Sequence, residues 1–166
     1  ELEKDILPMF RRAEITVNIF EPKRTDTEIV EAVVATPNSL TIEEILYSAT
    51  MTEDGEEQRA IYKQAVTYYP KDWRGYSNAA AVEIEMGDYD AAEQFLYKAE
   101  ELSPNNGIVE NQLGAVEFAK GNYGKAEEYF LAAKRNGEST DYNIGVCELQ
   151  KGNYGKALTY MSGTRC

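Results

Sequence analysis

Apolar residues recur every three or four positions through residues 39–166, in stretches of about a dozen residues that end in turn-forming residues. This spacing puts apolar side chains on one face of a helix and polar ones on the other. Gly-Asp-Tyr or Gly-Asn-Tyr separates neighbouring stretches three times, and such clusters break helices and form turns. The pattern therefore predicts a series of short helix pairs.

The helix pairs are copies of one repeat. The heptapeptide KGNYGKA occurs at 120–126 and again at 151–157. The similarity extends on both sides, so that 79–99, 113–133 and 144–164 align without gaps. Because the match covers parts of two helices, we interpret the heptapeptide as the turn of a structural repeat and not as a binding loop.

Each copy assigns the same roles to the same positions. A glycine ends the first helix, with separations of 34 and then 31 residues, at Gly87, Gly121 and Gly152. The polar residue after the glycine is expected to cap the second helix, at Asp88, Asn122 and Asn153. Small residues are expected where helices cross closely, at Ala80, Gly114, Gly145, Ala92, Ala126 and Ala157. Tyr123 and Tyr154, in the turn, are predicted to pack in the core.

These positions resemble the marker residues of the tetratricopeptide repeat, a family with a 34-residue period. In one copy the markers are Tyr76, Ala80, Gly87, Tyr89, Ala92, Ala99 and Pro104, and in the next they are Leu113, Gly114, Gly121, Tyr123, Ala126, Phe130 and Ala133. The resemblance implies an all-α fold, a right-handed α-α superhelix of helix pairs. It also implies a non-enzymatic protein that binds other proteins.

We expect four repeats in residues 39–166. The expected bounds are 39–72, 73–106, 107–137 and 138–166. The first is divergent, because Leu46 and Gln58 stand where small residues are expected, although a Thr41-x-x-Glu44 capping box opens its first helix. The third turns at Asn136-Gly137 without a closing proline, and the fourth is incomplete, ending inside its second helix.

Residues 1–38 differ from the array and are expected to form a short β segment and a linker. The stretch RAEITVNIF at 12–20 alternates polar and apolar residues, the period of a half-buried strand. Either this strand pairs with IVEAVV at 29–34, or it is the last strand of a domain that precedes Glu1. RRAEITV resembles the closing strand of OmpA-like peptidoglycan-associated domains. With the repeats, this resembles envelope proteins of the Bacteroides group and implies a periplasmic or outer-membrane-associated location, the alternative being cytoplasmic.

Composition limits the ligands and the catalytic sites that this chain is expected to have. The net charge is −12, with 22 acidic and 10 basic residues in 1–106 against 7 and 7 in 107–166. Such a surface repels nucleic acid, and no apolar stretch is long enough to insert in a membrane. The chain has no histidine, which disfavours zinc sites and Ser–His catalysis. Cys147 and Cys166 lack metal-ligand spacing and are expected to be free thiols. We expect no catalytic residue, metal or cofactor.

Three functions remain as hypotheses: a scaffold that binds a peptide or protein in the concave groove of the repeats, a structural module of an outer-membrane, peptidoglycan-associated complex, and, more distantly, an enzyme. Carboxylate pairs such as Glu127 and Glu128 diverge on a helix and do not face a cleft. The resemblance places groove contacts on first helices, by register, at Arg74, Ser77, Asn78, Ala81, Asn111, Gln112, Ala115, Phe118, Tyr142, Asn143, Val146 and Leu149. Only Arg74 fits a basic clamp for an acidic tail, so such a tail is not the expected ligand. An uncapped carboxy-terminal end near Tyr160 and Met161 predicts weak homo-oligomers.

Overall fold

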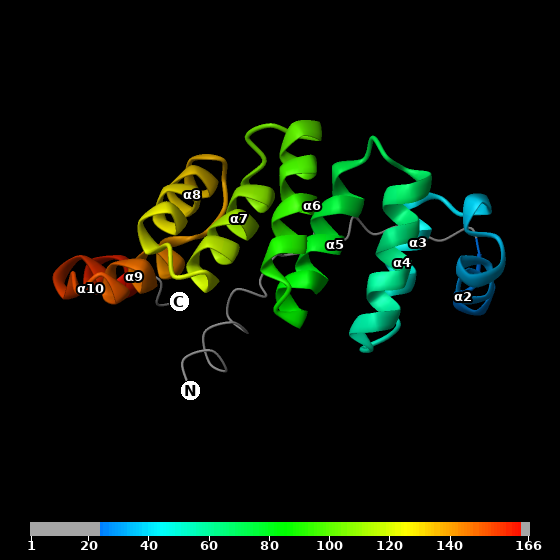
Figure 1. Ribbon diagram of the computed structural model, residues 1–166, viewed down its shortest axis with the longest axis horizontal. Coiled ribbons are helices and arrows are strands. Elements are labelled where there is room, and N and C mark those ends of the chain that lie inside the picture. The colour runs from blue at the N-terminus through cyan, green and yellow to red at the C-terminus, as the bar shows by residue number, and fades with distance from the viewer. Residues whose placement is uncertain (1–23, 164–166) are drawn as a thin grey trace. The chain divides into compact units, whose positions relative to one another are not determined.

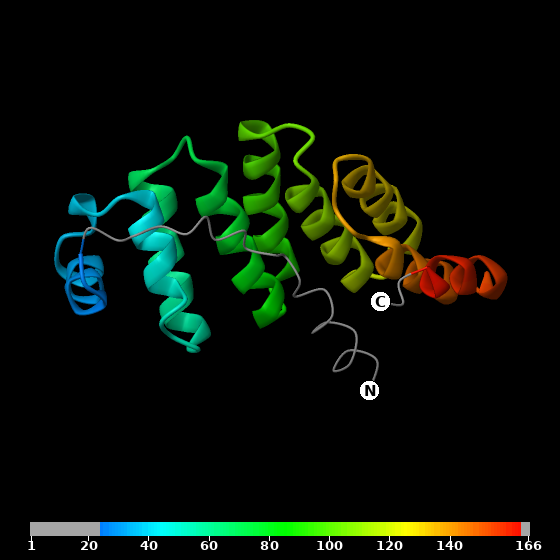
Figure 2. The same cartoon turned by 180° about the vertical axis from the view of Figure 1, so that it is seen from behind.

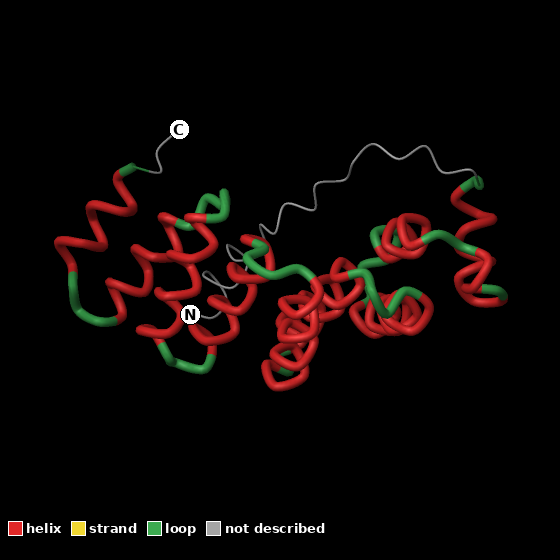
Figure 3. The backbone as a smooth tube through the Cα atoms, turned by 90° about the horizontal axis from the view of Figure 1, so that it is seen from above, coloured by secondary structure: helices red, strands yellow, loops and turns green. Residues whose placement is uncertain are grey.

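The computed structural model describes residues 24–163 of the chain. Every regular element in this range is helical, as Figure 3 shows in red. The α-helices are α2 (Asp26–Ala35), α3 (Ile42–Ala49), α4 (Gly55–Tyr68), α5 (Trp73–Met86), α6 (Tyr89–Leu102), α7 (Gly107–Ala119), α8 (Tyr123–Arg135), α9 (Asp141–Gln150) and α10 (Tyr154–Ser162), with a 3₁₀-helix η1 (Pro37–Ser39). The all-α prediction is confirmed. The predicted strand at 12–20 lies outside the described residues.

The described residues fall into two compact units, which we call the amino-terminal unit (24–102) and the carboxy-terminal unit (103–163). The amino-terminal unit holds α2 to α6, blue to green in Figure 1, and the carboxy-terminal unit holds α7 to α10, yellow-green to red. Within each unit, consecutive helices pack as pairs: α3 with α4, α5 with α6, α7 with α8 and α9 with α10. Figure 2 shows the same pairs from behind.

Three helix pairs turn in the same way. The glycine that ends the first helix has a φ of 80°, at Gly87, Gly121 and Gly152. A side chain is strained in this left-handed conformation, so glycine is favoured. The residue after the glycine donates its backbone N–H to a carbonyl five positions back, on Glu83, Glu117 and Glu148, at 2.8, 2.9 and 2.8 Å. The duplicated heptapeptide is therefore a helix-ending turn, as predicted.

The predicted caps of the second helices differ among the repeats. Asp88 caps as expected, since its Oδ1 accepts the backbone N–H of Ala91 at 3.1 Å. Asn122 and Asn153 make no side-chain cap bond, so the prediction is wrong for them. Asn122 instead donates from Nδ2 to Glu117 Oε2 at 2.8 Å. A charged oxygen accepts a stronger hydrogen bond than a neutral amide offers at the cap, and this interaction draws the side chain away.

The small residues lie at close helix crossings, as predicted. A Cβ added at Gly114 would lie 2.6 Å from the Phe130 ring, and one at Gly145 would lie 2.7 Å from Met161 Cγ. The four alanines at equivalent positions are all buried: Ala80, Ala92, Ala126 and Ala157. In these three pairs, the first helix therefore packs closely against the second at a small, buried residue.

The two turn tyrosines are not equivalent. Tyr123 is half-buried and its ring centroid lies 5.1 Å from that of Phe118. Tyr154 is 71% exposed, so the core prediction is wrong for it. The residue equivalent to Phe118 in the last repeat is Leu149, itself 40% exposed. Without an aromatic partner at that position, Tyr154 has no ring to pack against.

The segment at 29–34 is helical, and the predicted pairing of IVEAVV with a strand is wrong. These residues belong to α2, where Ile29 and Val33, one turn apart, are buried while Val34 is exposed. A capping box starts the helix: the backbone N–H of Thr25 donates to Glu28 Oε2 at 2.8 Å and that of Glu28 donates to Thr25 Oγ1 at 3.4 Å. A Thr-x-x-Glu sequence favours a helix start over a strand, and it was overlooked.

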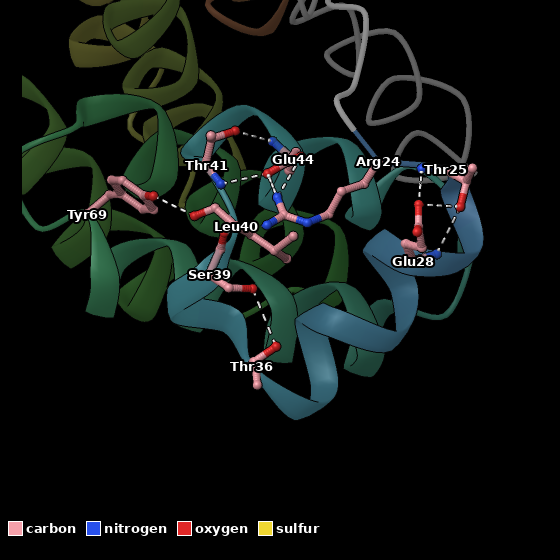
Figure 4. A network of polar contacts seen from close by, with 9 residues as sticks. All are labelled: Arg24, Thr25, Glu28, Thr36, Ser39, Leu40, Thr41, Glu44 and Tyr69. Carbon is pink, nitrogen blue, oxygen red and sulfur yellow. Dashed lines mark hydrogen bonds and ion pairs between the residues drawn. The ribbon is translucent and has the colours of Figure 1, made fainter.

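A buried carboxylate joins α2 to the first repeat (Figure 4). Glu44 accepts the backbone N–H of Thr41 at 2.8 Å, which completes the predicted capping box of α3. Arg24 Nη1 donates to both oxygens of Glu44, at 3.0 and 2.8 Å. Nearby, the hydroxyl of Tyr69 donates to the carbonyl of Leu40 at 2.5 Å. These bonds hold the segment before α3 against α3 and the end of α4.

Candidate functional site

The predicted groove residues lie on three first helices, one in the amino-terminal unit and two in the carboxy-terminal unit. Arg74, Ser77, Asn78 and Ala81 belong to α5, Asn111, Gln112, Ala115 and Phe118 to α7, and Tyr142, Asn143, Val146 and Leu149 to α9. The register prediction puts them on one face of each helix. Their contacts differ, and these decide what each side chain can offer a ligand.

Arg74 is occupied by acidic partners of its own unit. Its Nη2 lies 2.7 Å from Asp72 Oδ2 and 3.0 Å from Glu43 Oε1. The hydrogen bond to Asp72 is the main cause that raises the pKa of Arg74. Burial would raise the pKa of Asp72, but the bonds from Arg74 outweigh it and lower that pKa. Asn78 donates from Nδ2 to the Arg74 carbonyl at 2.9 Å, so this part of α5 is largely satisfied internally.

Asn111 and Asn143 meet between α7 and α9. Nδ2 of Asn143 donates to Oδ1 of Asn111 at 3.0 Å, and the two residues are 9% and 8% exposed. Among the described residues, neither the remaining amide group of Asn111 nor the remaining oxygen of Asn143 has a partner. Neither atom is fully buried. The pair therefore leaves one donor group and one acceptor atom without a partner among the described residues.

The other predicted groove residues contribute unequally. Ser77 and Gln112 are buried, Phe118 is half-buried against Tyr123, and Leu149 is exposed. Tyr142, next to Asn143 on α9, is half-buried. Among the predicted groove residues, hydrogen bonds thus join Asn111 to Asn143 in the carboxy-terminal unit and Asn78 to Arg74 in the amino-terminal unit.

A repeated buried glutamate was missed by the sequence analysis. It lies four residues before the turn glycine in three repeats, at Glu83, Glu117 and Glu148. These side chains are 5%, 3% and 1% exposed, and each forms an ion pair: with Arg59, Lys125 and Lys151. The signal was available, because all three aligned segments carry glutamate at this position. A charged residue on a helix usually faces solvent, which hides such a position from a reading of the sequence alone.

The last of these glutamates has the strongest electrostatic signature. Lys151 Nζ lies 2.5 Å from Glu148 Oε1, and this contact lowers the pKa of Glu148 to about 2 in spite of burial. Lys151 also pairs with Glu127 on α8. The arrangement joins α8, α9 and the turn after α9. A buried carboxylate with a fixed cation stabilises the charged form rather than poising it for proton transfer.

Neither metal nor membrane chemistry is evident in the range 24–163. Within it, no three Cys, Asp or Glu side chains lie close enough together to hold a metal ion. None of the helices in that range combines the length and the apolar character needed to cross a membrane.

One part of the chain matches a known family directly. Residues 74–106, which contain most of α5 and all of α6, match the tetratricopeptide repeat. No curated protein matches the chain. The direct match thus covers one helix pair, and the pairs α7–α8 and α9–α10 are related to it by the internal alignment and the shared turn geometry.

Solved structures extend the likeness to most of the chain. A crystal structure of MamA is similar with a TM-score of 0.69 and 19% identity, over 82% of this chain and 82% of that one. Another MamA structure gives a TM-score of 0.68 at 19% identity, over 82% of this chain and 77% of that one. The APC/C hetero-tetramer Cut9-Hcn1 gives 0.71 at 14% identity, over 83% of this chain but 28% of that one. The chain therefore has the fold of a tetratricopeptide-repeat solenoid.

Proposed function

We propose that this protein is a non-enzymatic scaffold that binds a peptide or protein segment along the first helices of its repeats. Stacked helix pairs expose a long, regular surface rather than an enclosed pocket, and such surfaces suit extended polypeptides. One structural neighbour, Cut9, is described as a hetero-tetramer with Hcn1, which supports a partner-binding role for this fold.

The asparagine pair carries the proposal. A peptide group has one N–H donor and one C=O acceptor. The Nδ2 group of Asn111 can donate to a peptide carbonyl, and the Oδ1 atom of Asn143 can accept from a peptide N–H. Tyr142, the residue before Asn143 on α9, can add a flat ring that buries area at low entropic cost. We therefore place the centre of the binding surface on α7 and α9.

The contacts of the buried carboxylates support a non-enzymatic role. Each of the three repeated glutamates is tied to a lysine or arginine of its own unit. A general acid or base at neutral pH needs a pKa near 7, whereas the pKa of Glu148 is lowered to about 2. These groups stabilise the repeats and are not prepared for catalysis.

Substitution of Tyr142 tests the binding surface. A partner captured with the parent protein is identified and purified, and its affinity is measured for Tyr142→Ala and for Tyr68→Ala. Tyr68 is a matched control, because it is 45% exposed on α4 and does not belong to the proposed surface on α7 and α9. We expect Tyr142→Ala to weaken binding at least about tenfold. In the parent protein, we expect the bound partner to slow hydrogen exchange of the backbone amides of α7 and α9. Equal affinities for both variants would reject this surface.

We further propose that the protein works in a bacterial envelope, in the periplasm or at the outer membrane, with the cytoplasm as the alternative. The support is the RRAEITV stretch and its resemblance to OmpA-like domains, in residues outside the described range. A more specific form of this proposal is a structural role in an outer-membrane, peptidoglycan-associated complex. Fractionation of cells that produce the natural gene product tests the location, and recovery in the cytoplasm alone would exclude the envelope.

A further inference from the structure

A depression of about 520 Å³ lies in the amino-terminal unit, lined by residues of α4, α5 and α6. In Figures 1 and 2, α5 lies between α4 and α6. None of the predicted groove residues lines it. Because second helices provide most of its wall, this depression differs from the proposed binding surface on the first helices. We call it the α4–α6 pocket.

Positive charge is concentrated in this pocket. Residues 24–102 carry 17 acidic but only 6 basic side chains. Three of those six line the α4–α6 pocket: Arg59, Lys63 and Lys98. Two others, Arg24 and Arg74, are held in ion pairs elsewhere. Half of the cations of a strongly acidic unit therefore converge on one depression.

The donors face the pocket in two helical pairs. Arg59 and Lys63 are one turn apart on α4, and Gln94 and Lys98 are one turn apart on α6, so each pair shares a helix face. Among the described residues, the side chains of Lys63 and Gln94 have no hydrogen bond or ion pair. Lys98 pairs only with Glu101, at 2.7 Å, on the exposed side of α6. Donors from two helices are thus available to one ligand.

The two acidic residues of the pocket are already engaged. Glu83 is buried and accepts from Arg59 Nε at 2.9 Å. Asp88 is exposed at the start of α6, where its Oδ1 accepts the N–H of Ala91. Outside the lining, Glu56 pairs with Arg59 and Glu101 pairs with Lys98. Lys63 is thus the one cation of the pocket whose side chain has no ion pair among the described residues.

An apolar wall accompanies the donors. Phe95 and Tyr76 both line the pocket and are half-buried. Phe95 also packs against the core of the amino-terminal unit. A ligand with an apolar side chain beside its negative charge would satisfy both features. The net negative charge of the surrounding unit disfavours a long acidic run, because every additional charge is repelled.

We infer that the α4–α6 pocket binds a single carboxylate of a partner polypeptide, flanked by an apolar residue, through Lys63, Gln94 and Lys98. The carboxylate comes either from an acidic side chain or from a chain terminus. This inference shares with the proposed function only that the ligand is a polypeptide. Its site is separate from Tyr142, so either site can fail while the other holds.

Two short peptides distinguish the sources of the carboxylate. The full chain, labelled with ¹⁵N, is titrated with acetyl-Ala-Phe-Glu-amide and with acetyl-Ala-Ala-Phe bearing a free carboxyl terminus. Acetyl-Ala-Phe-Gln-amide is the uncharged control. We expect backbone amide shifts at Lys63, Gln94 and Lys98 with at least one charged peptide and none with the control. Shifts with the first peptide identify a side-chain carboxylate, and shifts with the second identify a terminal one.

Variants of the pocket complete the test. Lys63→Gln is expected to reduce the association constant at least about tenfold, because it removes a charge-assisted hydrogen bond. The double variant Lys63→Gln with Lys98→Gln should show no saturable shift. Lys71→Gln is the matched control, an exposed lysine of the same unit outside the pocket, and should bind as the parent does. Circular dichroism checks that each variant is folded. No shift with either charged peptide, or equal binding by the double variant, would overturn the inference.

Discussion

Small residues set how closely the paired helices approach. In the carboxy-terminal unit, Gly114 of α7 faces the Phe130 ring of α8, and Gly145 of α9 faces Met161 of α10. At the same position in the amino-terminal unit, Ala80 is fully buried. The α5–α6 crossing therefore has room for the methyl group of an alanine, whereas the α7–α8 and α9–α10 crossings do not. All three crossings use a small residue, but the space between the two helices differs.

We predict opposite effects for two glycine substitutions in the carboxy-terminal unit. Gly114→Leu should lower the free energy of unfolding by about 1–3 kcal/mol, because its Cβ alone would lie 2.6 Å from Phe130. Gly124→Ala should be neutral or raise it by up to about 1 kcal/mol, since a Cβ there meets nothing within 4 Å and alanine favours a helix. Denaturant unfolding measures both. An unchanged midpoint for Gly114→Leu would mean that this crossing is not tight.

Cys147 should be unreactive in the folded protein. It is fully buried, and this burial, helped by the charge of Glu127, raises the pKa of its thiol to about 12. Almost no thiolate is present at pH 8, and the thiolate is the reactive form. We expect iodoacetamide to modify Cys147 at pH 8 only after denaturant is added, as judged by peptide mass spectrometry. Rapid modification without denaturant would show that the carboxy-terminal unit opens readily.

At the scale of elements, ion pairs and caps fix where helices start and how they join. The repeated glutamates tie each first helix to a basic side chain: of the preceding helix for Glu83, of the following helix for Glu117, and of the turn for Glu148. The glutamate at this position of the repeat thus finds its basic partner on a different element in each of the three repeats. Burying such a charge is favourable only because a partner is always present.

Glu148 should make the carboxy-terminal unit sensitive to acid. Its pKa is lowered to about 2 by Lys151, so it contributes stability that is fully present above its ordinary pKa of about 4.3. That contribution is lost as the pH falls from about 4.3 towards 2. We expect Glu148→Gln to be less stable than the parent at pH 6 and to lose less stability between pH 6 and pH 3.

A neighbouring glutamate provides the control for this pH effect. Glu128 is exposed on α8 and has no charge partner among the described residues, so Glu128→Gln should follow the parent's pH dependence. Urea unfolding at the two pH values compares the three proteins. Identical pH dependence for Glu148→Gln and the parent would show that Glu148 is not preferentially charged in the folded state.

The capping box of α3 should contribute measurably to the amino-terminal unit. Thr41→Ala removes the hydroxyl that accepts the backbone N–H of Glu44, and we expect a loss of about 1 kcal/mol. Thr36→Ala is the matched control, because the Thr36 hydroxyl bonds no backbone N–H of η1 and makes only a 3.3 Å contact with the exposed Ser39 hydroxyl. Fluorescence of the chain's one tryptophan, Trp73 at the start of α5, follows unfolding of this unit. Equal midpoints for both variants would argue against the cap.

At the scale of the whole molecule, charge and exposed apolar side chains decide association. The excess of negative charge resides in 1–106, whereas 107–166 is balanced. The last helix, α10, carries Tyr154 and Leu158 at 71% and 66% exposure, while Tyr160 and Met161, named from the sequence, are half-buried. The apolar surface thus lies one turn earlier than predicted, in a region without net charge repulsion.

Self-association is therefore predicted to run through α10. We expect sedimentation of the protein to show weak, concentration-dependent oligomers, which Leu158→Lys removes by placing a charge in the apolar patch. Val34→Lys is the control, because Val34 is 80% exposed on α2. A strict monomer at high concentration, or equal loss with the control variant, would contradict this prediction.

The sequence determined the repeated part of this fold because its signals are local. The turn glycines, the small crossing residues and the capping box at Thr41 each depend on a few neighbouring positions, and repetition reinforced them. The sequence also carried the capping box at Thr25 and the shared glutamate, but competing interpretations, a strand and a solvent-facing charge, were preferred.

Only the tertiary structure decided which side chains are occupied. Helical register placed Arg74, Asn111 and Asn143 on groove faces, yet it could not show that Arg74 is held by Asp72 and Glu43, or that the two asparagines bond each other. The α4–α6 pocket was equally invisible, because its donors come from helices about 30 residues apart. Periodicity fixes the direction of a side chain on its own helix. The partner it meets depends on how separate helices pack, and that determines which polar groups stay free for a ligand.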